Sequence, residues 1–118
     1  FIINEVAGNI DGYRLSTYMH KARGGKLKMG PIWDLNIGYG TGGRVPVNDW
    51  IINYNNYVTN DAWMVPFWWK RLMEDPQFRS ELKSRWTELR TNTLSTPKVL
   101  ELTTNTSNYL TNNNAIIH

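Results

Sequence analysis

The chain has 118 residues, with 13 Lys or Arg against 10 Asp or Glu and no cysteine. The lack of cysteine excludes disulfide frameworks, thiolate zinc sites and cysteine nucleophiles. The formal charge of +3 is small and the basic residues are dispersed, so we expect no nucleic-acid partner. No apolar stretch is long enough to span a bilayer, whereas a content of 13% aromatic residues is sufficient for a folded core.

All nine glycines precede residue 44, and the predicted elements change in type near residue 60. Residues 1–6 resemble the middle of an apolar element with no capping residue before it, so we expect a piece cut from a longer protein. The exposed edge at residues 1–3 would permit self-association. Alternating bulky and polar side chains predict a strand over 13–19, with 27–29 as its hairpin partner. A further extended segment is predicted over 32–37, and a long loop over 38–60.

Residues 61–118 contain no glycine and predict three helices. Asp61 is a candidate N-cap, and the first regular helix is expected to begin at or just before Pro66. Asp75-Pro76 predicts the second start, and Ser95-Thr96-Pro97 predicts a third helix that Thr and Asn residues weaken. The four apolar residues that the second helix places on one face are Phe78, Leu82, Trp86 and Leu89.

These elements predict an α+β fold in a single domain over residues 1–118. A small antiparallel hairpin with metal-site loops would occupy residues 1–60, and a helical bundle residues 61–118. The run Gly38 to Gly43 fits the spacing of a dinucleotide fingerprint, but no helix start follows it. We interpret this run as a loop that moves over a ligand.

Asp11 and Asp34 are the carboxylates that could carry chemistry, because both lie at loop edges beside aromatic residues. One interpretation makes them ordinary turn and strand-end residues, since Asp-Gly is a frequent turn pair. The other makes them converge on a divalent cation, because Mg²⁺ is usually held by one or two carboxylates together with phosphate oxygens. Ser16 would then add a hydroxyl. The residues alone leave both interpretations open.

Two motifs carry a resemblance to a known family: the run from Asn9 through Asp11 to Tyr18, and the run from Gly30-Pro31 through Asp34 to Asn36. With Pro66-Phe67-Trp68-Trp69 and Asp75-Pro76 farther on, they resemble the spore-coat protein CotH kinase family, in its gut-bacterial, surface-associated branch. The similarity covers roughly residues 1–90.

The resemblance implies an atypical kinase, with this chain similar to part of a protein-kinase C-lobe. It implies ATP with Mg²⁺ or Mn²⁺ as cofactors, a protein partner with a Ser or Thr acceptor, and an extracytoplasmic or cell-surface location in a bacterium. Asp11 matches the catalytic aspartate, which also touches metal, and Asp34 matches the metal-binding aspartate. Ser16 and Asn36 stand where many members have Asn and a second acid, so they are expected to be weaker cofactor ligands.

The same resemblance places the ATP-clamping lysine and covering loop upstream of residue 1, so we expect no turnover from this piece alone. The alternative is a non-catalytic surface module for adhesion or glycan binding on a degenerate kinase-like framework. Its candidate sugar platform is a group of four tryptophans: Trp63, Trp68, Trp69 and Trp86. Their helical spacing favours packing in the core instead.

Overall fold

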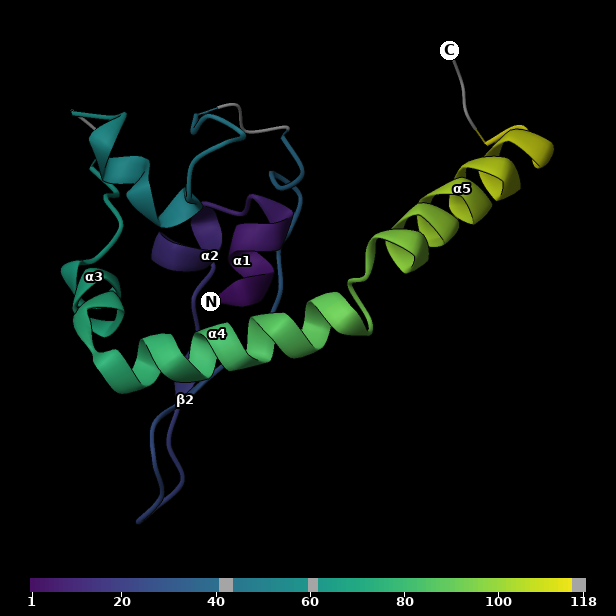
Figure 1. Ribbon diagram of the computed structural model, residues 1–118. Coiled ribbons are helices and arrows are strands. Elements are labelled where there is room, and N and C mark those ends of the chain that lie inside the picture. The colour runs from purple at the N-terminus through teal and green to yellow at the C-terminus, as the bar shows by residue number, and fades with distance from the viewer. Residues whose placement is uncertain (41–43, 60–61, 116–118) are drawn as a thin grey trace. The chain divides into compact units, whose positions relative to one another are not determined.

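The computed structural model describes residues 1–40, 44–59 and 62–115. The elements in chain order are α1 (Ile2–Ala7), α2 (Asp11–Arg14), β1 (Met19–His20), β2 (Lys28–Met29), the 3₁₀ helix η1 (Ile51–Asn56), α3 (Phe67–Glu74), α4 (Pro76–Thr91) and α5 (Thr96–Asn112) (Figure 1). Helices and a small antiparallel sheet in one chain confirm the predicted α+β class. The chain forms two compact units, Phe1–Phe78 and Arg79–His118, with the boundary inside α4.

The end of α1 is a glycine-dependent turn that leads directly to the candidate site. Gly8 has φ 64°, a left-handed conformation that glycine adopts without strain. The Asn9 amide donates to the Asn4 carbonyl at 2.8 Å, and the Gly8 amide donates to the Glu5 carbonyl at 3.2 Å. This pair of bonds is a Schellman motif, which satisfies the last carbonyls of α1 and sets the direction in which the chain leaves it.

Helix α2 packs closely against α1 because Gly12 has no side chain. A β-carbon at Gly12 would lie 2.3 Å from Asn4 Oδ1, well inside van der Waals distance. The Gly12 carbonyl accepts hydrogen bonds from Asn4 Nδ2 at 3.0 Å and from Thr17 Oγ1 at 2.8 Å. The strand predicted over 13–19 is therefore wrong for most of its length, because contacts with α1 hold Asp11–Arg14 in a helical turn.

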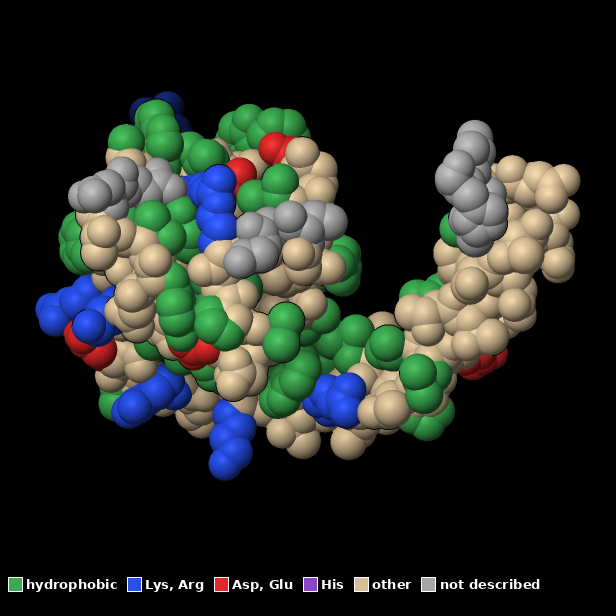
Figure 2. All heavy atoms as spheres, turned by 90° about the horizontal axis from the view of Figure 1, so that it is seen from above, with side chains coloured by type: hydrophobic (Ala, Val, Ile, Leu, Met, Phe, Trp, Pro, Cys, Tyr) green, Lys and Arg blue, Asp and Glu red, His purple; other side chains and the backbone are tan. Residues whose placement is uncertain are grey.

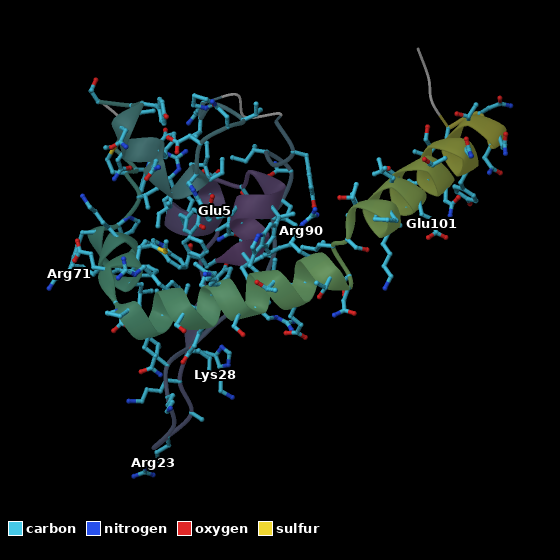
Figure 3. All side chains as sticks on the ribbon, viewed as in Figure 1. Glu5, Arg23, Lys28, Arg71, Arg90 and Glu101 are labelled. Atoms are coloured by element: carbon cyan, nitrogen blue, oxygen red, sulfur yellow. The ribbon has the colours of Figure 1, made fainter. Side chains whose placement is uncertain are left out.

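Strands β1 and β2 form a short hairpin that projects away from α1 and α2 (Figure 1). Met19 pairs with Met29 and His20 with Lys28 in antiparallel register, and all four residues are exposed. Each strand has two residues, so the predicted hairpin partner over 27–29 is confirmed while the strand length is not. Figure 3 shows Arg23 at the tip of this hairpin, far from the enclosed Glu5.

The loop predicted over 38–60 contains a 3₁₀ helix, η1, so that prediction is wrong for residues 51–56. The Glu5 carboxylate of α1 explains η1: it accepts the Ile51 amide at 2.7 Å, the Ile52 amide at 3.0 Å and the Tyr13 hydroxyl at 2.6 Å. An acid near the N-terminus of a helix accepts hydrogen bonds from the free amides there and interacts favourably with the helix dipole. Burial and the neighbouring Glu5 carboxylate raise the pKa of Tyr13, so its hydroxyl stays protonated and donates.

The core of the first unit is aromatic. Tyr13 and Tyr54 are fully buried and Trp69 is 3% exposed. The Tyr13 and Trp69 rings meet edge to face with centroids 4.7 Å apart, and Trp69 Nε1 donates to the Tyr13 carbonyl at 3.0 Å. This geometry suits the quadrupoles of the rings and gives the indole N–H a partner. Phe1 packs at the edge of the same cluster, with its ring centroid 5.8 Å from that of Tyr13.

Three helix starts match the prediction closely. Helix α3 begins immediately after Pro66, α4 begins at Pro76, and α5 begins at Thr96, directly after Ser95. The capping role predicted for the acid before α4 is confirmed, because Asp75 Oδ1 accepts the Phe78 amide at 2.8 Å. The predicted cap Asp61 lies outside the described residues.

The four tryptophans of the second half differ from one another. Trp69 is buried, Trp68 is half-buried, and Trp63 and Trp86 are 61% and 42% exposed. The prediction of core packing is therefore confirmed for Trp69 and wrong for Trp63 and Trp86. Within the part of the chain that the structure describes, no helix combines the length and apolarity that crossing a bilayer demands.

Candidate functional site

Asp11 is the first residue of α2, and its carboxylate is bound by Arg14, the last residue of the same helix. Arg14 Nε donates to Asp11 Oδ1 at 2.9 Å, and the two side chains are 5% and 22% exposed. A guanidinium that donates to a carboxylate restricts its orientation, and its positive charge favours the ionised form of the acid. Asp11 therefore presents its carboxylate at the surface in a defined direction.

Arg14 is itself anchored in the core of the first unit. Its NH1 donates to the Tyr54 hydroxyl at 3.2 Å and to the Trp63 carbonyl at 2.8 Å, and its guanidinium carbon lies 4.7 Å from the centre of the Tyr54 ring. Sequence reasoning missed this residue. Its signal was the spacing of Asp11 and Arg14, which share a face in a helix but not in the strand that was predicted.

Asp34 follows the hairpin and is exposed, with φ 59° in the left-handed region. Asp enters this region more readily than most residues, but the conformation still needs support from its surroundings. Two side chains contact the residue. Ser16 Oγ donates to Asp34 Oδ2 at 3.0 Å, and Asn9 Nδ2 donates to the Asp34 carbonyl at 3.5 Å.

Ser16 joins the two aspartates of the candidate site. Its amide donates to the Asp11 carbonyl at 2.7 Å while its hydroxyl donates to the Asp34 carboxylate. Ser16 therefore lies beside the Asp11 backbone and the Asp34 carboxylate, although a hairpin separates Asp34 from Asp11 and Ser16 in the chain. Asn36 is exposed and lies just beyond Asp34, in the turn over residues 36–40.

The chemistry of these groups fits a hard divalent cation. Carboxylate and hydroxyl oxygens are the ligands that Mg²⁺ prefers, and Mg²⁺ typically retains water or phosphate oxygens in its remaining positions. Among the described residues, no three His, Cys, Asp or Glu side chains cluster closely enough to form a metal cage. Asp11, Asp34 and Ser16 therefore suit a cation that a nucleotide phosphate helps to hold.

A separate pocket of about 320 Å³ lies between α1 and the segment that leads to η1. Its lining includes Glu5, Gly8, Arg44 and Asp49 but none of the four candidate site residues. The Glu5 carboxylate in its wall is already engaged by the backbone of η1. We therefore assign the pocket no part in the candidate site.

The aromatic residues give mixed support to a sugar-binding platform. Trp68 and Trp69 stack with an interplanar angle of 30°, but Trp69 is buried, so the pair does not form an open surface. Tyr18 and Trp33 are half-exposed neighbours whose rings are inclined at 49°. Figure 2 shows hydrophobic, basic and acidic side chains intermixed on one face.

Comparison of the sequence with known proteins identifies a family. The family model described as CotH kinase protein matches residues 1–116. Searches of curated proteins and of solved structures found no significant match. The likeness to a protein-kinase C-lobe thus stays a prediction, whereas the family match extends over nearly the whole sequence. The chain belongs to the CotH kinase family.

Proposed function

We propose that this chain carries the metal-binding and acceptor-orienting part of a CotH-like kinase that phosphorylates Ser or Thr residues of proteins. Kinases in general use ATP with a divalent metal, and positioning with charge neutralisation supplies most of their rate acceleration. The observation that carries the proposal is Ser16, which contacts the Asp11 backbone and the Asp34 carboxylate at once.

Each residue of the site has a role that its position supports. Asp11 orients the acceptor hydroxyl and takes its proton as the hydroxyl oxygen bonds to the γ-phosphorus and the bond to the β-phosphate oxygen breaks. Arg14 keeps the Asp11 carboxylate in place. Asp34 and Ser16 supply oxygens for Mg²⁺ or Mn²⁺, and Asn36 is a weaker ligand. Bound Mg-ATP would supply the phosphoryl group and neutralise its charge.

The wider setting of the protein is also a proposal. We place its substrate among proteins with an accessible Ser or Thr, at a bacterial cell surface or outside the cytoplasm. We also retain self-association through residues 1–3 as a proposal; these residues are half-buried, and the Phe1 ring contacts Tyr13 and Trp69. For this chain by itself we propose binding of the metal nucleotide without turnover.

Paramagnetic broadening tests the metal site directly. Mn²⁺ with ATP, added to the ¹⁵N-labelled chain, should broaden the amide resonances of Asp11, Ser16 and Asp34 before others. Asp34→Asn keeps an oxygen for the Ser16 hydroxyl but removes the charge, and should abolish this broadening. Asp49→Asn is the matched control, because Asp49 is a loop aspartate outside the site, and it should behave like the wild type.

Equal broadening in the wild type and Asp34→Asn would refute the metal site. The alternative proposal is a glycan-binding module, and the exposed side chains of Trp33 and Trp63 are the observation that supports it. It predicts that oligosaccharides, rather than Mn²⁺ with ATP, perturb the resonances of these tryptophans.

A further inference from the structure

Asn9 is the fully buried polar side chain beside the candidate site, with an exposed fraction of 0%. Its Nδ2 group donates to the backbone carbonyl of Asp34. Its Oδ1 atom is buried and has no hydrogen-bond partner among the described residues. The opposite orientation of this amide would place Oδ1 against the Asp34 carbonyl, two acceptors face to face, so the donor must point toward Asp34.

Stability does not explain an asparagine at this position. A buried acceptor without a partner lowers stability, because the oxygen loses its hydrogen bonds to water and gains none in the fold. An apolar side chain of similar size would avoid this loss. A residue that breaks a local rule of packing while contacting a strained neighbour is typical of a functional site.

Asn9 links the end of α1 to the segment that follows the hairpin. Its backbone belongs to the Schellman motif of α1, where its amide donates to the Asn4 carbonyl at 2.8 Å. Asp34 is exposed, has φ 59° and follows the projecting hairpin. The hydrogen bond from Asn9 joins residues 25 positions apart and, with the bond from Ser16, ties Asp34 to the part of the chain that carries Asp11.

We infer that Asn9 is a positioning residue: its amide holds the Asp34 carbonyl and so keeps the Asp34 carboxylate within reach of the Ser16 hydroxyl. This inference rests on the proposed metal site. It assigns Asn9 no contact with metal or substrate. Removing a residue that hydrogen-bonds a metal ligand without touching the metal typically lowers metal affinity about 10- to 100-fold.

The test compares Asn9→Leu with the wild type in two measurements. The thermal midpoint should stay equal or rise, because the substitution removes the unpaired oxygen and keeps the volume. The affinity for Mn²⁺ with ATP, read from broadening at Asp34 and Ser16, should fall about 10- to 100-fold. In the ligand-free protein, the Asp34 and Leu35 amide resonances should also shift, because their backbone loses its tether.

Asn55→Leu is the matched control. The Asn55 amide bonds both backbone groups of Val65, donating to the carbonyl at 2.9 Å and accepting the amide at 2.8 Å. This variant should lower the thermal midpoint and leave Mn²⁺ broadening unchanged, the opposite of Asn9→Leu. Should Asn9→Leu not fold, Asn9→Ala removes the same amide without added bulk and should show the same loss of affinity.

A lower thermal midpoint with unchanged Mn²⁺ affinity in the Asn9 variant would overturn the inference, since that result describes a purely structural residue. If the wild type itself shows no broadening, the proposed metal site fails. The ligand-free resonances still decide the role of Asn9 in that case: a shift at Asp34 supports it, and unchanged resonances overturn it.

Discussion

Asp49 is the described residue whose charge most clearly links local structure to pH. Its carboxylate accepts the Trp50 amide at 2.7 Å, Asn53 Nδ2 at 2.8 Å and the Tyr57 hydroxyl. The hydrogen bond from Tyr57, with those from Asn53 and Trp50, lowers the pKa of Asp49 below its ordinary value. The ionised Asp49 carboxylate thus bonds the residues at both ends of η1, Trp50 before it and Tyr57 after it.

The sign of this shift predicts acid sensitivity. As pH falls, the unfolded chain protonates Asp49 first, near its ordinary pKa of about 3.9, so the stabilisation is complete above that pH. It is lost as pH falls through the lower pKa of the folded state. Asp49→Asn should therefore flatten the dependence of the urea midpoint on pH between about pH 5 and pH 2. An unchanged slope in this variant would contradict the role of Asp49.

At the scale of elements, η1 exists because a carboxylate from α1 caps it. Glu5→Ala would leave the Ile51 and Ile52 amides and the Tyr13 hydroxyl without their acceptor. We expect a loss of about 3 kcal/mol in the free energy of unfolding, measured by urea denaturation.

Tyr13→Phe is the matched variant for the Glu5 prediction. It removes one donor from the Glu5 carboxylate and leaves both backbone amides of η1 satisfied, so its cost should be about 1 kcal/mol. Equal losses in the two variants would mean that the Tyr13 bond, rather than the cap of η1, carries the effect.

At the scale of the whole molecule, the two units differ in what stabilises them. The described buried residues of the core cluster, from Ile10 to Trp69, all belong to the unit Phe1–Phe78. Helix α5, in the other unit, has no buried side chain and is rich in Thr and Asn. A helix with low propensity and no buried face is only marginally stable.

Hydrogen exchange should separate the two units. Amides of α5 should exchange far faster than the Tyr13 and Trp69 amides, because local opening of α5 exposes no core. Glu5→Ala should speed exchange in the first unit and leave α5 unchanged. Uniform protection across both units, or acceleration of α5 by the Glu5 variant, would contradict this division.

The sequence predicted helix starts well where a cap or a proline next to the first turn sets the start. Pro66, Asp75-Pro76 and Ser95 mark the starts of α3, α4 and α5, because a cap or a proline acts on the adjacent turn. The strand predicted over residues 13–19 was wrong for most of its length. Its alternation is a weak signal beside the contacts of Gly12 with Asn4, which hold α2 in a helical turn.

The sequence by itself therefore determined the family, the α+β class and the helix starts, and it singled out Asp11 and Asp34 as candidates. Only the tertiary structure decided what surrounds those acids: Arg14 at the Asp11 carboxylate, Ser16 at the Asp34 carboxylate, and Asn9 at the Asp34 carbonyl. The physical reason is distance along the chain. Caps and turns join near neighbours, whereas the bonds from Asn9 to Asp34 and from Ile51 to Glu5 span 25 and 46 positions, and the path of the backbone alone brings such partners together.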